Sequence, residues 1–193
     1  MPLWAGNMVE GRGMLGLQGG DGAVRMMDYQ EKRCPLYNNG WLSLITVITA
    51  NAPVPPAFRE SVRCGEQNLY SRAKELVGDR DPRSHEFTVQ LRAMDMDRSG
   101  YGLGLPVLLA LCGSLVERST KGGLIVVGSL NLGGSVDMIP NPAAVAELAV
   151  EKGAAQLLMP ISARRQLLDL PDEMATKLNI VFYADPPDAF LKA

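Results

Sequence analysis

Residues 123–141 read GLIVVGSLNLGGSVDMIPN, and this stretch decides the fold. Its opening run of apolar and β-branched residues predicts a buried strand over residues 123–128. The Gly-Gly pair predicts a tight hairpin over residues 131–139. A proline at the first helical position and a glycine after the last one predict a helix over residues 142–152. We therefore expect a strand, a hairpin and a helix in immediate succession.

Strands and helices continue to alternate on both sides of this stretch. Upstream, alternating apolar and polar side chains predict a half-buried strand over residues 86–94, and a run that is apolar nearly all round predicts a central helix over residues 103–116. Downstream we expect buried strands at residues 156–160 and 180–183, a turn-and-helix unit from Pro171, and a closing helix over residues 188–192. This alternation predicts an α/β or α+β fold with one core.

The first part of the chain has a different character. Residues 1–40 are rich in glycine and show little helical periodicity, so we expect short strands joined by turns, the strongest over residues 23–30. Residues 41–50 read WLSLITVITA and predict a largely buried strand, which prolines then stop. From residue 57 the period becomes that of an amphipathic helix, which is expected to end near Gly78.

Composition narrows the class of protein. The chain has 193 residues, 47% of them hydrophobic and 21% charged, which fits one domain with a substantial core. Nineteen basic residues against 21 acidic ones give a net charge of −2, which provides no electrostatic footprint for nucleic acid or an anionic membrane. A glycine, a proline or a charged residue interrupts every apolar stretch before roughly 20 residues, so we expect none of them to span a bilayer. Without a basic, apolar leader at the N-terminus, the chain is expected in the cytoplasm.

Cysteine and histidine usage excludes several kinds of chemistry. Cys34, Cys64 and Cys112 form no CxxC pair, and their odd number argues against a disulfide framework. His85 is the single histidine, so a histidine-based triad or a multi-histidine zinc site is nearly excluded. We expect His85 to be a surface or strand-entry residue. No GxxxxGK(S/T) phosphate loop occurs, so this chain is expected to hold no cofactor or ATPase machinery of its own.

One turn could carry chemistry. Residues 97–102 read DRSGYG and place Ser99 just before the predicted central helix, where helix N-terminal amides can stabilise an oxyanion. A nucleophilic serine needs a base, and with one distant histidine only a lysine could serve. Taken alone, such a turn is common, and an ordinary loop is the favoured interpretation.

The order of these elements resembles the proteolytic domain of the Lon family. There, a serine-bearing loop opens an apolar helix, a strand and a glycine-rich hairpin follow, and the first turn of the next helix supplies the catalytic lysine. The present hairpin matches the family pattern at Gly128, Leu130, Leu132, Gly134, Val136 and Ile139. The resemblance implies an α+β, ribosomal-S5-like fold with mixed sheets over residues 57–193. Residues 1–56, a glycine-rich β segment, fit the family pattern only loosely, and we expect them to be part of the same domain.

The sequence departs from this family at both catalytic positions. Anchored on the hairpin, the nucleophile position falls on Gly100, so Ser99 could act only after a one-residue slip. The lysine position falls on Ala143, and no lysine lies between Lys121 and Lys152. Because an alanine cannot accept a proton, the Ser–Lys dyad is absent as the residues stand. Either lysine could substitute only by an unusual path across the fold.

Residues 124–134, 146–154 and 158–162 also resemble the C-terminal region of Lon-related proteins of the BREX phage-defence system. That resemblance implies a domain of an AAA+ ring oligomer, with ATP and DNA bound only through parts missing from this chain. Three functions follow as hypotheses: a non-catalytic assembly or gating module, an active endopeptidase cutting unfolded protein through Ser99, or an S5-like binding module. Scattered positive charge such as Arg164 and Arg165 speaks against the third. Self-association is expected, with Met26 and Met27 or the glycine-rich segment as possible contacts.

Overall fold

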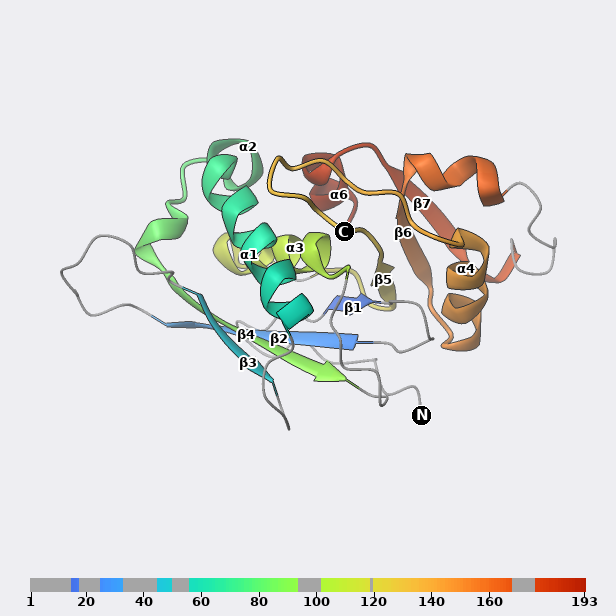
Figure 1. The fold of residues 1–193 in the computed structure, drawn as a ribbon, viewed down its shortest axis with the longest axis horizontal. Helices are drawn as coiled ribbons and strands as arrows, with labels where there is room; N and C mark the ends of the chain where they lie inside the picture. Colours follow the sequence, from blue (N-terminus) through green and yellow to red (C-terminus); the bar gives the residue numbers. More distant parts are fainter. Residues whose placement is uncertain are drawn as a thin grey trace.

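The strands form one mixed sheet in the order β3-β4-β2-β1-β5-β6-β7 (Figure 1). The structure is a computed structural model that describes residues 15–17, 25–32, 45–49, 56–93, 102–118, 120–167 and 176–193. The strands are β1 (Leu15–Leu17), β2 (Arg25–Lys32), β3 (Ile45–Thr49), β4 (Glu86–Ala93), β5 (Leu124–Val126), β6 (Gln156–Pro160) and β7 (Asn179–Tyr183). Each strand expected between residues 23 and 183 is therefore present, with ends shifted by a few residues.

The sheet has an antiparallel half and a parallel half. In the first half, β2 pairs antiparallel with both β1 and β4, while β3 pairs parallel with β4. In the second half, β5, β6 and β7 run parallel to one another, and the short β1 joins the halves by pairing parallel with β5. The mixture of helices with parallel and antiparallel strands agrees with the α+β expectation.

The helices pack against the two faces of this sheet. They are α1 (Pro56–Ser71), α2 (Ala73–Val77), α3 (Gly104–Val116), α4 (Pro142–Glu151) and α6 (Pro186–Lys192), with 3₁₀ turns η1 (Pro82–Ser84) and η2 (Ile161–Leu167). Figure 1 shows α1 and α3 over the antiparallel half and α4 beside β6. Among the residues that the structure describes, no helix is long and apolar enough to cross a membrane.

Helix α3 is the central helix that the sequence predicts. Every residue from Gly104 to Leu115 is buried. The helix stops at Glu117, whose backbone is left-handed (φ 56°) and whose N–H donates to Ser114 O. An apolar helix of this kind is stable only when other elements surround it.

The helix expected over residues 57–78 is broken, and this expectation is corrected. Residue Arg72 leaves helical geometry (φ −122°) and separates α1 from α2. Its backbone oxygen accepts the N–H groups of Glu75 and Leu76, which starts α2. Its guanidinium reaches across the molecule to Gly133 O at 3.2 Å. Gly78 ends α2 with a positive φ (69°), as the sequence predicts.

The closing helix begins earlier than expected. The sequence predicts a start at residue 188, whereas α6 starts at Pro186. Asp185 is the N-cap, because its carboxylate accepts the N–H of Asp188 at 2.8 Å. Pro171 and the unit expected after it lie outside the described residues.

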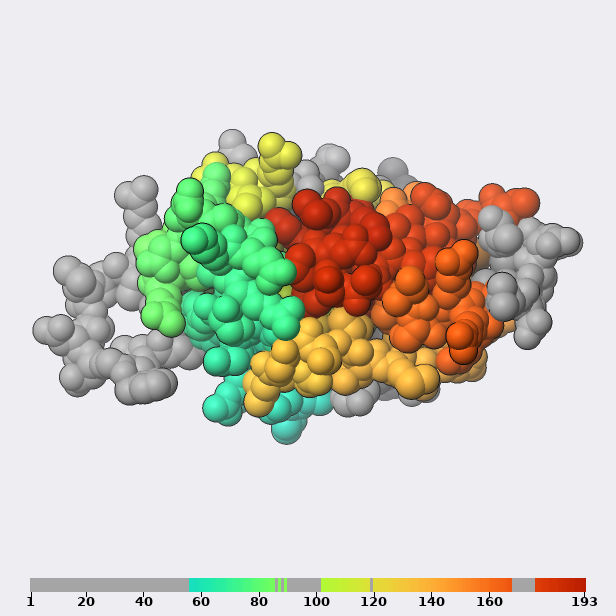
Figure 2. All heavy atoms as spheres, turned by 90° about the horizontal axis from the view of Figure 1, so that it is seen from above, coloured from blue at the N-terminus to red at the C-terminus, as the bar shows by residue number. Residues whose placement is uncertain are grey.

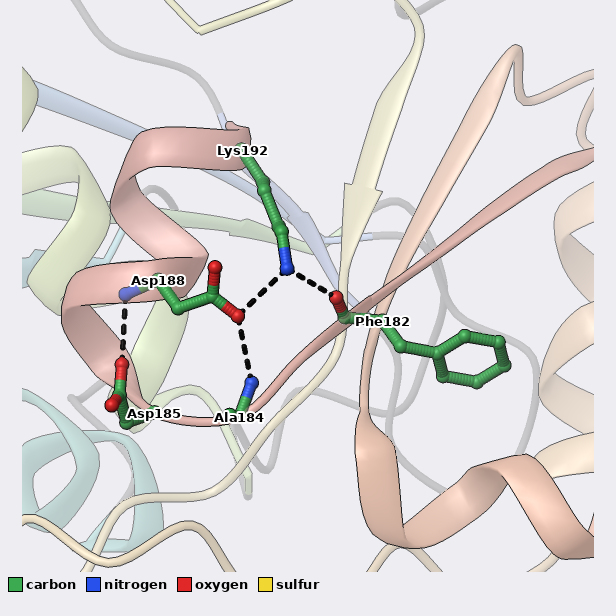
Figure 3. Close-up of polar contacts among 5 residues, drawn as sticks. All are labelled: Phe182, Ala184, Asp185, Asp188 and Lys192. Carbon is green, nitrogen blue, oxygen red and sulfur yellow. Dashed lines mark hydrogen bonds and ion pairs between the residues drawn. The ribbon is translucent and has the colours of Figure 1, made fainter.

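A group of polar contacts ties α6 to β7 (Figure 3). The Asp188 carboxylate accepts the Ala184 N–H at 2.9 Å and the Lys192 ammonium at 2.7 Å. The same ammonium donates to Phe182 O at 2.8 Å. The hydrogen bond from Lys192 and that from the Ala184 N–H hold the pKa of Asp188 below its ordinary value.

Candidate functional site

The chain that follows Ser99 enters the described structure at Gly102, just before α3. Ser99 and Gly100 themselves lie outside the described residues. From Gly102 onward the chain is held tightly: the N–H of Leu105 donates to Gly128 O at 3.2 Å. A side chain on Gly104 would place its Cβ 3.0 Å from the Leu130 nitrogen. The start of α3 is therefore packed against the segment that follows β5.

That segment, residues 127–141, is called the β5–α4 connection. Buried Tyr183 fixes its beginning, since the Tyr183 hydroxyl donates to Val127 O at 2.8 Å. The hydroxyl oxygen also occupies the space that a Cβ on Gly128 would need. Only glycine allows this approach, which gives a physical reason for the glycine that opens the hairpin pattern.

The predicted hairpin is present as a tight turn. Leu130 and Val136 form a single antiparallel bridge. Within the turn, the Asn131 N–H donates to Ser135 O at 3.1 Å, and the Asn131 side chain accepts the Ser135 N–H at 3.0 Å. Gly134 has a positive φ (80°), which explains why a glycine stands at this place.

Asn68 on α1 anchors this turn, and the sequence reasoning missed it. Its side chain is 1% exposed, and its amide donates to Cys64 O at 2.8 Å and to Asn131 O at 2.9 Å. A Cβ on Gly134 would lie 2.6 Å from the Asn68 Oδ1. One turn later, Arg72 adds the contact to Gly133. A polar residue on the apolar face of an amphipathic helix was the signal that could have found it.

The far end of the connection starts α4 at the position where the resemblance expects a lysine. Asn141 adopts a left-handed conformation (φ 48°), and its side chain accepts the Ala144 N–H at 3.3 Å. Pro142 is buried as the first residue of the helix, and Ala143 follows it half-buried. A methyl side chain offers neither a proton acceptor nor a charge at this helix start.

The two lysines considered as substitutes lie elsewhere. Lys152 follows the last turn of α4, nine residues beyond Ala143, which corresponds to about 13 Å along a helix. It pairs with Glu151 at 3.6 Å. The Lys121 ammonium donates to Lys192 O, at the end of α6. Neither lysine is placed at the start of α4.

The other residues considered for chemistry are His85 and the three cysteines. His85 enters β4 as expected, with Nδ1 2.9 Å from the Ser84 hydroxyl and 3.1 Å from Asp81 O. Cys64 and Cys112 are buried free thiols, and burial raises the pKa of both. Cys34 lies outside the described residues. Within them, no group of three or more histidine, cysteine or acidic residues is arranged to hold a metal ion.

The chain is similar in sequence to several named proteins, although no family model matches it. It is 28% identical over 135 residues to the Lon-like protease BrxL of Escherichia coli O9:H4 (strain HS), which covers 70% of this chain and 20% of that protein. It is 28% identical over 139 residues to the Lon-like protease BrxL of Bacillus cereus (strain H3081.97), again 70% of this chain and 20% of the relative. The Lon protease of Methylocella silvestris is 26% identical over 149 residues, 76% of this chain and 18% of the relative.

These matches show that the chain is related to Lon and Lon-like proteases, as the resemblance in the sequence predicts. Within that class, it is related to the Lon-like proteases named BrxL. The chain spans about a fifth of the length of these relatives, 20% in both BrxL proteins.

Proposed function

We propose that this chain is a Lon-like proteolytic-type domain that has lost its Ser–Lys dyad and acts as an assembly or gating module of a larger ATP-driven ring in phage defence. The ATPase module and any DNA contact belong to parts outside this chain. Residues 1–56 belong to the same domain, a proposal supported by the pairing of β1 with β5 and of β2 and β3 with β4.

One observation carries this proposal. Ala143 occupies the first turn of α4, at the lysine position of the family pattern. The β5–α4 connection that leads to it is held by hydrogen bonds from other parts of the chain. Asn68, Arg72 and Tyr183 all bond to backbone oxygens of that connection. Because the β5–α4 connection is held in place while the lysine that would accept the proton is absent, a structural role is favoured over hydrolysis.

The test is cleavage of casein by the full-length parent protein with ATP. We expect background cleavage from the wild type and from Ser99→Ala alike. Ser162→Ala, an exposed serine at the start of η2, is the matched control. Cleavage by the wild type that Ser99→Ala abolishes and Ser162→Ala keeps would overturn the non-catalytic role and assign Ser99 as the nucleophile of an active endopeptidase.

The assembly role is tested separately by the mass of the parent protein in solution. We expect a ring-sized oligomer from the wild type. Removal of residues 1–193 is expected to reduce it to smaller species. A ring that persists unchanged after this removal would argue against the assembly role, whatever the casein result.

A further inference from the structure

We draw no further inference here: the strongest candidate, the exposed apolar side chains of Leu132 and Met138 on the β5–α4 connection, carries none, because nothing in the structure shows what covers them.

Discussion

The two faces of the parallel strands are packed in different ways. Alternate residues of β5, β6 and β7 point to opposite faces, so each strand contributes to two cores. The first core contains α1, α3 and α6 and is built mainly of leucine, valine, phenylalanine and Tyr183. The second core lies under α4, and three of its nine buried members in the described residues are alanines: Ala146, Ala149 and Ala154.

This difference bears on the candidate site, because the site spans both cores. The start of α3 belongs to the first core, where Leu103 and Leu105 are fully buried. The start of α4 belongs to the rim of the second core, where Ala143 is half-buried. Figure 2 shows the β5–α4 connection (gold) bordering both α1 (green) and α6 (red), on the face where α4 and η2 (orange) also appear. The connection therefore joins the first core, which is built mainly of large side chains, to the smaller second core, which contains three alanines.

The largest expected effect compares a leucine from each core. Leu109→Ala in α3 is expected to lower the free energy of unfolding by about 4 kcal/mol, and Leu157→Ala in β6 by about 3 kcal/mol. Both side chains are fully buried. The cavity beside α3 is enclosed by the larger core, whereas the smaller core under α4 and η2 can relax more easily to fill the other. Urea unfolding measures both values, and a larger loss for Leu157→Ala would reverse the comparison.

The next effect tests the point where the cores meet. Gly128→Ala is expected to cost about 2–3 kcal/mol, because the new methyl group collides with the buried Tyr183 hydroxyl. Tyr183→Phe alone is expected to cost about 1 kcal/mol through the lost hydrogen bond to Val127.

The double variant sharpens this test. Because Tyr183→Phe removes the colliding oxygen, the two substitutions together are expected to cost less than the sum of their separate effects in urea unfolding. Gly122→Ala is the control, since no atom lies within 4 Å of the Cβ position there. Additive losses in the double variant would show that the hydroxyl is not the obstacle.

A smaller effect concerns the anchor on α1. Asn68→Ala is expected to cost about 1–2 kcal/mol, because Asn131 O loses a buried donor. Arg72→Ala removes an exposed contact to the same turn and is expected to cost about 0.5 kcal/mol. Hydrogen exchange of residues 131–135 should rise more in the first variant than in the second. An equal rise in both variants would show that the buried Asn68 contact holds the turn no more strongly than the exposed Arg72 contact.

The local pattern of the sequence predicts most of this fold. Helix α3, strands β4 to β7 and the start of α4 at Pro142 follow from apolar periodicity and helix-start signals, because these elements are stabilised by their own buried faces. The break at Arg72 does not follow, and the Arg72 guanidinium contacts Gly133, 61 residues away in the sequence. The same limit applies to Asn68, whose partner Asn131 is 63 residues away.

The candidate site is predicted only in part. The place of Ala143 in the first turn of α4 follows from the hairpin pattern and Pro142. The fixing of the connection by Tyr183 does not, because no local signal links β7 to Gly128. Ser99, the predicted nucleophile of the alternative function, stays a prediction because it lies outside the described residues.

The smallest effect concerns the cover that α6 gives to the first core, and it depends on pH. The hydrogen bonds from Lys192 and the Ala184 N–H lower the pKa of Asp188 in the folded chain, so the folded state binds its proton less readily than the unfolded state. This contribution to stability is present above about pH 4 and is lost as the pH falls through the lowered pKa. Side chains that are 32% and 38% exposed limit it to about 0.5 kcal/mol. Asp188→Asn should therefore lower the free energy of unfolding at pH 7 but not at pH 2, measured against Asp79→Asn, an exposed aspartate between α2 and η1. The same loss at both pH values would mean that α6 is held by its apolar contacts with α3 and not by this carboxylate.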